Sequence, residues 1–175
     1  MRLPGYGGGS QAATSAFSRL AVGGCFFLIF LALLSAALAG RYQIAFNASS
    51  SVGSKVLLLR LTTAEQYALG SIVAFAFDGS QWGFPAGTPW AKRVVGIAGE
   101  TVQVAGDAVL VGGRPVAMLH KPMMESQRLS AASEGVIPQG YLFVAGEHER
   151  SFDSRYREFG LIPVSAVFGR AIAAM

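Results

Sequence analysis

The hydrophobic residues of this chain form one long continuous run followed by many short ones. From Leu20 to Gly40 no charged residue interrupts the run. At about 1.5 Å per residue, a helix of this length spans roughly 30 Å, the thickness of the hydrocarbon core of a bilayer. The pattern predicts a transmembrane anchor over residues 20–40, preceded by a short tail over residues 1–19.

The charges around this run predict the orientation of the anchor. The tail carries Arg2 and Arg19 and no acidic residue, so by the positive-inside rule it stays in the cytoplasm and residues 41–175 are exported. A cleaved signal peptide is the alternative, since Ala37-Leu38-Ala39 fits an A-x-A cleavage site. The apolar run is longer than the roughly 7–15 residues of a signal-peptide core, which favours the anchor. Both interpretations export the remainder of the chain.

The exported part shows short runs of β-branched and aromatic residues separated by Gly and Pro, a pattern typical of β-strands. Strands are predicted at residues 56–61, 71–77, 92–97, 101–104, 108–111, 141–145 and 166–172. Gly106-Asp107 is expected to form a hairpin turn, Gly112-Gly113 to end the following strand, and residues 80–90 to form a turn-rich loop. We therefore expect a mostly-β fold, with one compact antiparallel domain over residues 41–175.

Composition agrees with an anchor and one exported domain. Of 175 residues, 52% are hydrophobic and 14% charged, against about 25% charged in ordinary soluble domains. The mean hydropathy of +0.45 excludes a disordered chain. The net charge of +4 arises near the N-terminus, because no acidic residue precedes Glu65, so no nucleic-acid partner is expected. Cys25, His120 and His148 are widely spaced, so we expect no metal and no cofactor.

Three stretches carry candidate chemistry, namely residues 47–53, 92–100 and 151–160. Each alone has an ordinary interpretation: a Ser-rich linker, a strand ending in a Gly turn, and a polar loop. A Ser hydroxyl becomes a nucleophile only when a neighbouring base removes its proton. Lys92 lies in an otherwise apolar strand, and burial lowers the pKa of a Lys amine so that it can act as that base. The combination favours a Ser–Lys dyad.

The same stretches resemble the motif boxes of the signal peptidase I family, which are membrane-anchored Ser–Lys proteases. KRVVGIAGE (92–100) is similar to that family's KR-[VI]-[VI]-G-x-x-GD box, with Glu100 where Asp is usual. GSIV (70–73) resembles its GD-[IV]-V strand, and SFDSRYREFG (151–160) its S-x-D-S-R-x-[FYW]-G box. The IPVSAVFGRA segment that follows resembles the closing strand. The boxes occur in the family's order from the helix to the C-terminus.

The resemblance implies a role for each matched residue. Ser51 would attack the scissile carbonyl, and Lys92 would take its proton and deliver it to the leaving amine. Ser49 matches the oxyanion-hole hydroxyl, and Ser151 matches the hydroxyl that orients the Lys amine. In addition, Asp153 with Arg155 or Arg93 would form an ion pair that holds the Lys strand against the Ser151 loop.

Two further positions depart from the family's pattern. General signal peptidases usually show Ser-Met-x-Pro at the nucleophile, whereas Val52-Gly53 follows Ser51 here. Ser49 and Ser50 therefore remain neighbouring candidates, although the offset from Asn47 and the separation from Lys92 favour Ser51. The last box usually opens with Gly-Asp; Gly146-Glu147 stands nearby, and no role is assigned to Glu147.

The branch of the family suggests the substrate. The spelling SFDSRY and the Asn-x-Ser-x-Ser start resemble the TraF-type peptidases of conjugative transfer, small members that mature a pilin subunit. We expect a single-pass inner-membrane serine endopeptidase with its catalytic domain in the periplasm. Its expected partners are the lipid bilayer and an exported precursor, a conjugative pilin first of all, with hydrolysis and cyclisation both open. The alternatives are a general signal peptidase I and a non-catalytic assembly protein of the conjugative secretion apparatus.

Overall fold

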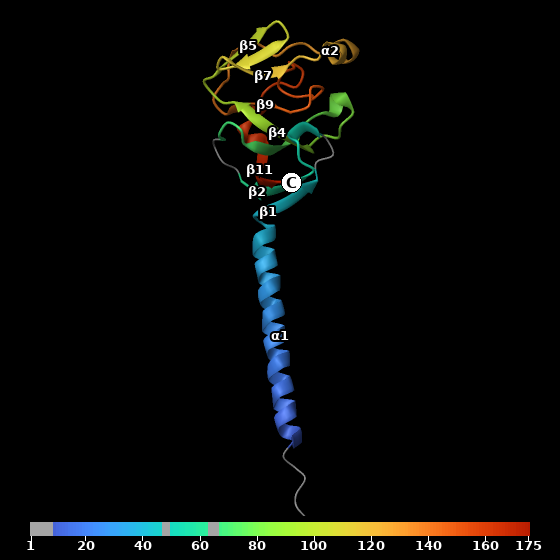
Figure 1. Cartoon of the computed structure of the whole chain (residues 1–175), viewed down its shortest axis with the longest axis vertical. Coiled ribbons are helices and arrows are strands. Elements are labelled where there is room, and N and C mark those ends of the chain that lie inside the picture. Colours follow the sequence, from blue (N-terminus) through green and yellow to red (C-terminus); the bar gives the residue numbers. More distant parts are fainter. Residues whose placement is uncertain (1–8, 47–49, 63–66) are drawn as a thin grey trace, which may run out of the picture. The chain divides into compact units, whose positions relative to one another are not determined.

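The structure, a computed structural model, describes residues 9–46, 50–62 and 67–175. The chain divides into two compact units, residues 1–41 and 42–175. In the first unit, helix α1 runs from Gly9 to Ala39 (Figure 1). It begins well before Leu20, the expected start, because residues 9–19 include several Ala, the best helix former. Within the described residues, no helix meets the combined length and hydropathy required of a membrane span.

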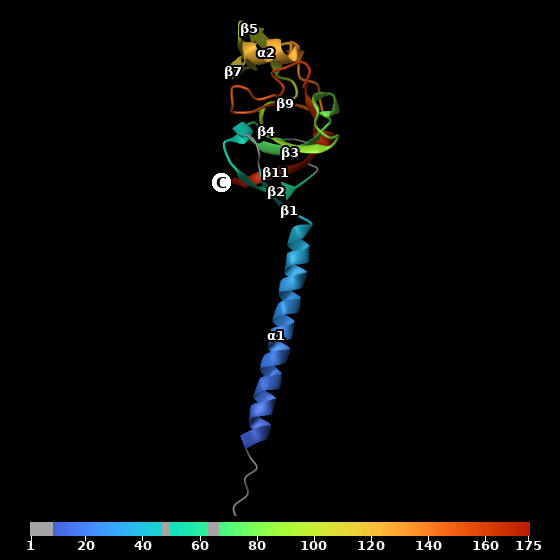
Figure 2. The same ribbon diagram turned by 90° about the vertical axis from the view of Figure 1, so that its right-hand side faces the viewer.

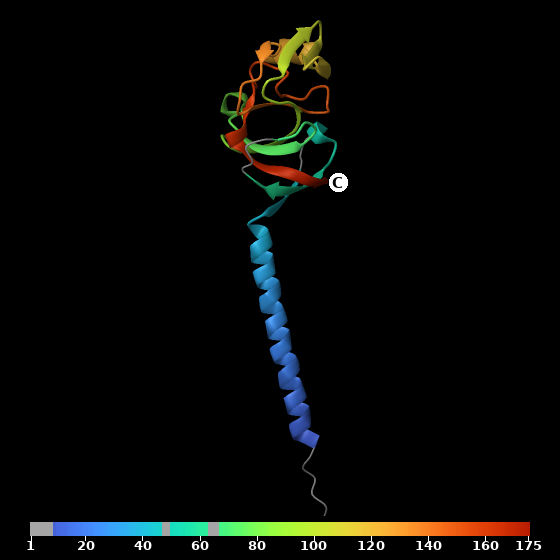
Figure 3. The ribbon, with the colours of Figure 1, turned by 90° about the vertical axis from the view of Figure 1, so that its left-hand side faces the viewer.

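The second unit is a mostly antiparallel β domain, as expected from the sequence. Its larger sheet has seven strands in the order β1-β2-β11-β3-β4-β9-β10. Their bounds are β1 Tyr42–Phe46, β2 Val56–Leu61, β3 Ile72–Phe77, β4 Thr88–Gly96, β9 Tyr141–Ala145, β10 Ile162–Pro163 and β11 Val167–Ala174. Figure 2 shows β4, β3, β11, β2 and β1 in succession. In Figure 3, β11 (red) lies between β3 and β2, so the end of the chain completes the sheet.

A smaller sheet lies at the other end of this domain, with the order β7-β6-β5-β8 (Figure 1). It comprises β5 Thr101–Ala105, β6 Ala108–Val111, β7 Arg114–Met118 and β8 Gly135–Val136. The predicted hairpin turn at Gly106-Asp107 is confirmed, since Ala105 pairs with Ala108. Gly112 and Gly113 form a second tight turn, with φ of 56° and 74°. Positive φ at both central residues is what a type I′ hairpin requires.

Several elements differ from the sequence prediction. The strand expected from Lys92 starts at Thr88, so Trp90 lies in β4 and not in a loop. Pro89 is tolerated there because β4 pairs with β9 only from Arg93 onward, and a Pro fits where one strand edge is open. Strands β1, β7, β8 and β10 were not predicted. Helix α2, Lys121–Gln127, was also missed because seven residues are too few to show a helical period.

An aromatic core fixes the strands that carry the candidate site. The ring of Phe77 lies 4.6 Å from that of Phe159 and 4.8 Å from that of Trp90, between centroids. Phe152 packs against the same rings. Burying such side chains contributes about 1.5–3 kcal/mol each. The cluster therefore joins β3 and β4 to the loop that contains residues 151–160.

Candidate active site

Ser51 lies in a short 3-10 turn, η1, which spans Ser50–Val52. Two contacts hold this turn. The side chain of Val52 is buried in a cluster with Leu57 and Leu59, and the carbonyl of Ser51 accepts a hydrogen bond of 2.8 Å from the backbone N–H of Glu147. Ser51 itself is only 7% exposed. These two contacts fix the backbone from which the Ser51 side chain projects.

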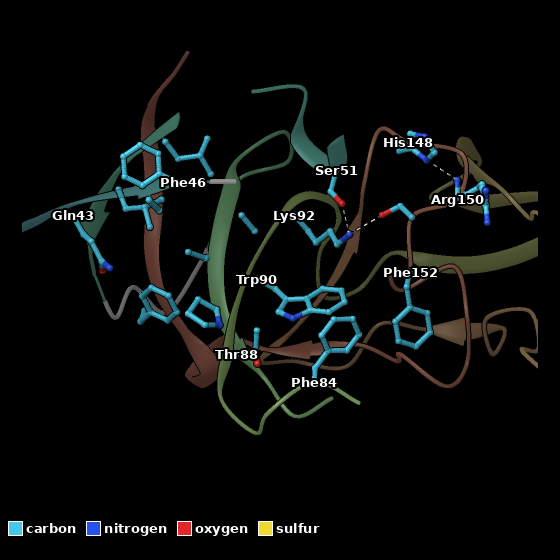
Figure 4. A pocket seen from close by; sticks show the side chains of 18 residues that line it. Gln43, Phe46, Ser51, Phe84, Thr88, Trp90, Lys92, His148, Arg150 and Phe152 are labelled. Carbon is cyan, nitrogen blue, oxygen red and sulfur yellow. Dashed lines mark hydrogen bonds between the residues drawn. The ribbon is translucent and has the colours of Figure 1, made fainter. Parts of the chain in front are cut away.

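Lys92 lies on β4, opposite Val73 of β3, and is 2% exposed. Its Nζ lies 2.8 Å from the Oγ of Ser51 and 2.6 Å from the Oγ of Ser151 (Figure 4). Residues from three separate stretches of the sequence thus meet at one amine. A base within hydrogen-bond distance of a hydroxyl, oriented by a third group, is the arrangement that activates a nucleophile.

The surroundings of Lys92 favour its neutral form. Burial lowers the pKa of Lys92 to about 8, because desolvation disfavours the ammonium; the charge of Asp153 opposes this shift and that of Arg155 adds to it. The Trp90 ring, whose centroid lies 5.3 Å from Nζ, also favours the ammonium. Desolvation is the largest of these effects, so the amine loses its proton at about pH 8, well below the range of a free Lys.

Asp153 and Arg155 form a fully buried ion pair, as the sequence suggested. Nε and Nη2 of Arg155 lie 2.8 and 2.9 Å from the two carboxylate oxygens of Asp153. The guanidinium also donates to the carbonyls of Met118, Glu149 and Gly146. Oδ2 of Asp153 accepts a hydrogen bond from the N–H of Gly146. Because every donor of the guanidinium has an acceptor, the pair compensates its own desolvation and stiffens the loop around Ser151.

Of the two arginines named as alternative partners of Asp153, the structure pairs Arg155 with it and not Arg93. Successive side chains of a strand point to opposite sides, and Lys92 takes the side that faces Ser51 and Ser151. Arg93 instead forms an ion pair with Glu147 and donates to the carbonyl of Gly70. Glu147 therefore has a contact that sequence reasoning missed. One sequence feature could have indicated this contact: Gly146-Glu147 stands close to the place where the family's last motif box usually opens with Gly-Asp.

Gly146 lies where no side chain fits. A Cβ at this position would collide with Oγ of Ser151 and would approach Cβ of Ser51 to 3.2 Å. Its N–H and carbonyl are both held by the Asp153–Arg155 pair. The close approach of this backbone brings Ser51 and Ser151 to the same amine. Ser49 lies outside the described residues, so its predicted role as an oxyanion donor stays a prediction.

An open groove of about 440 Å³ runs past the Ser51–Lys92 pair. Its wall includes Phe46 of β1, Trp90 of β4 and, beyond Ser151, His148 and Arg150 (Figure 4). Sequence reasoning did not place these four side chains at the site, because their proximity depends on how β1, β4 and the 146–151 loop come together. Among the described residues, no group of His, Cys, Asp or Glu is arranged to hold a metal ion.

The chain resembles known proteins in sequence. Residues 18–175 match the family described as signal peptidase, peptidase S26. The crystal structure of a signal peptidase I from Enterococcus faecalis V583 is 25% identical, with 59% of this chain and 95% of that chain covered and a TM-score of 0.38. No curated protein sequence matches the chain. Since the family match covers most of the chain, the protein belongs to the signal peptidase (peptidase S26) family and is a serine endopeptidase that processes exported proteins.

Proposed function

We propose that Ser51 is the nucleophile of this peptidase and that Lys92 is its general base. The observation that carries the proposal is the buried Nζ of Lys92, within 2.8 Å of Ser51 Oγ and 2.6 Å of Ser151 Oγ. The neutral amine takes the proton of Ser51 as Oγ attacks the scissile carbonyl. It then gives that proton to the departing amine, leaving an acyl-enzyme ester on Ser51.

Three supporting groups complete the proposed mechanism. Ser151 holds the amine in line with Ser51, and the Asp153–Arg155 pair holds Ser151 through the loop. The backbone N–H of Ser51 and the hydroxyl of Ser49 are assigned to the oxyanion, by resemblance to the family. A donor of this kind is worth about 3 kcal/mol of transition-state stabilisation.

The substrate is proposed to bind as an added strand. Residues 88–91 of β4 have a free edge toward the groove, since pairing with β9 begins at Arg93. Gln43 and Ala45 of β1 line the same groove. An extended peptide between these two strands gains main-chain hydrogen bonds and places its carbonyl at Ser51.

We further propose a single-pass inner-membrane location, with residues 20–40 as the anchor and the catalytic domain in the periplasm. The uncharged run and the Arg residues of the tail support this orientation. The favoured substrate is a conjugative pilin precursor, supported by the SFDSRY spelling and by Val52-Gly53 in place of Met-x-Pro. A general signal peptidase I is the alternative, because the dyad geometry suits both substrates.

The acyl-enzyme has two chemically balanced fates. Water hydrolyses the ester and releases a shortened linear product, or the substrate's own amine attacks it and yields a cyclic product lighter by one water. The groove is open to solvent as well as to a peptide, so both acceptors can reach Ser51. The non-catalytic alternative gives no reason to bury an amine between two hydroxyls, where desolvation is costly.

The test is the intact mass of a prepilin and of a general signal-peptide-bearing protein, each co-expressed with the full chain. We expect the wild type to shorten the prepilin, and Ser51→Ala and Lys92→Ala to leave it intact. Ser80→Ala and Lys55→Ala change exposed residues outside the groove and serve as matched controls. Maturation by both dyad variants would support the assembly-protein alternative, and shortening of the second protein would support a general signal peptidase.

A further inference from the structure

Two side chains beside the dyad take no part in the proposed mechanism. His148 and Arg150 are exposed and line the groove that holds Ser51 and Lys92. In Figure 4 they lie on the opposite side of the dyad from Gln43 and Phe46. A peptide that passes the dyad along the groove therefore meets them.

The backbone holds both residues in a defined turn. The N–H of Ser151 donates to the carbonyl of His148 at 3.0 Å, and the N–H of Arg150 donates to Nδ1 of His148 at 3.1 Å. The carbonyl between them, that of Glu149, accepts a hydrogen bond from the buried Arg155. Because Nδ1 is an acceptor, the neutral ring of His148 carries its proton on Nε2. Both side chains thus offer only donors at their outer ends.

Among the described residues that line the groove, no carboxylate balances these groups. Its described lining contains Lys92, Arg150 and His148 but no Asp or Glu. Glu147 is paired with Arg93, and Glu149 is not part of the lining. In the described part of the chain, Arg150 itself has no ion-pair partner. Because the proposed mechanism uses Lys92 as a neutral amine, the uncompensated positive charge at this end of the groove is that of Arg150.

The opposite end of the groove has a different character. Phe46 of β1 lies there (Figure 4), and the apolar lining residues Leu57, Leu59 and Phe168 belong to the cluster that packs with Ala45 of the same strand. A substrate complementary to both ends carries an apolar segment on one side of the scissile bond and a negative charge on the other. Attraction between opposite charges fixes the position of such a substrate in the groove and favours it over uncharged competitors.

We propose that Arg150 and His148 form a subsite for a carboxylate of the substrate, close to the scissile bond and on the side away from the apolar end of the groove. The planar guanidinium suits a carboxylate, which it binds through two parallel hydrogen bonds. The carboxylate comes either from an Asp or Glu side chain or from the substrate's own C-terminus. This inference rests on the proposed function of the site.

The experiment uses the full chain in detergent with synthetic peptides. The neutral reference peptide has Ala-Gln-Ala before the scissile bond and Gln at the other positions near the bond. Each test peptide replaces one of these Gln residues by Glu, so that the series moves a single carboxylate along the groove. A further pair ends shortly after the bond with a free carboxylate or an amide, which separates the two sources. We expect the Glu peptide at the matching position to show a kcat/KM about two- to fivefold above its Gln partner, typical of an exposed ion pair.

Substitution assigns this preference to the subsite. In Arg150→Gln the ratio of kcat/KM for the Glu and Gln peptides should fall to about one, and in Arg150→Lys it should be intermediate. Arg157→Gln is the matched control, since Arg157 is also exposed but lines a different groove. A second readout is the affinity of the same peptides for Ser51→Ala, measured by fluorescence anisotropy, which needs no turnover.

Each outcome decides one question. If kcat/KM and affinity are equal for the charged and the neutral peptides, the carboxylate subsite is overturned. A preference for Glu that persists in Arg150→Gln overturns it as well. In both cases, cleavage of the precursor still upholds the proposed function. A preference in binding without any cleavage of peptide or precursor leaves the subsite standing and overturns the proposed function. Preference for the free-carboxylate peptide over the amide assigns the charge to the substrate's C-terminus.

Discussion

At the scale of single residues, the lowered pKa of Lys92 makes activity depend on pH. Only the neutral amine accepts the proton of Ser51, and its pKa is lowered to about 8 by burial. We expect kcat/KM to rise about tenfold per pH unit below pH 8 and to level off above it. The measurement is kcat/KM from pH 6 to 9. Lys55→Ala, at an exposed lysine, should keep this profile; a flat profile would contradict a Lys base.

The same residue links pH to stability. Because the pKa of Lys92 is lower in the folded chain than the 10.5 of a free Lys, the folded state releases its proton first. The cost of burying the ammonium is therefore fully present below pH 8 and disappears as pH rises from about 8 to 10.5. The wild type should gain up to about 3 kcal/mol relative to Lys92→Met over this range. Denaturant unfolding at each pH measures it, and parallel curves for the two proteins would be evidence against the shift.

Ser49 gives a third prediction at this scale, since the resemblance assigns its hydroxyl to the oxyanion. Removing a donor that acts only in the transition state lowers kcat and leaves KM nearly unchanged. We expect Ser49→Ala to reduce kcat by about 100- to 1,000-fold. Ser50→Ala is the control in the neighbouring position. If Ser50→Ala and not Ser49→Ala shows the loss, the oxyanion donor is Ser50 and the register of the motif changes.

At the scale of elements, the loop that opens at Gly146 sets the distance between the two hydroxyls. Gly146→Ala forces Ser151 away, because the Asp153–Arg155 pair prevents the backbone from moving instead. A displacement of about 1 Å costs about 100-fold in rate, and overpacking costs about 1–3 kcal/mol of stability. Steady-state kinetics and thermal unfolding measure both effects.

Gly169→Ala is the matched control for that substitution. Gly169 lies in β11, and a Cβ there would meet its neighbours at 3.5 Å or more, which is ordinary contact. This variant should keep both activity and stability. Equal behaviour of the two variants would show that the Ser151 loop yields to the added methyl group, and that the close approach at Gly146 does not position the dyad.

The sequence predicted the elements unevenly, for physical reasons. β2, β6 and β9 have the predicted bounds because each is a short, mostly apolar run between turn residues. The start of β4 was missed because Pro89 argues against a strand unless the open edge beside it is known. α2 depends on a local cap, with Nδ1 of His120 accepting from the N–H of Met123, which periodicity cannot detect.

The site shows the same division between local and long-range information. Ser51, Lys92 and Ser151 could be predicted because their motifs are local in sequence, and the structure places them together. The pairing of Arg93 with Glu147 and the positions of His148 and Arg150 in the groove could not. These contacts depend on how β4 and the 146–151 loop pack in three dimensions, and the spacing of residues in the sequence does not predict that packing.

At the scale of the whole molecule, every buried hydrophobic cluster of the described chain lies within the second unit, residues 42–175. The peptidase domain should therefore fold without residues 1–40. We expect a chain of residues 41–175 to unfold cooperatively within a few degrees of the full chain and to cleave a soluble peptide with the same kcat/KM. A large loss of melting temperature would show that α1 supports the β domain.

The anchor proposed for residues 20–40 predicts a different result for a membrane-embedded precursor. Sharing a bilayer raises the effective concentration of enzyme and substrate without adding any contact at the site. In liposomes, the full chain should therefore cleave an embedded precursor 10- to 100-fold faster, as an order-of-magnitude estimate, than residues 41–175 do, while the soluble peptide is cleaved equally. Because the peptide reports the dyad alone, this pair of rates separates anchoring from catalysis. Equal rates on the embedded precursor would remove the anchor from the proposed function and leave the dyad untouched.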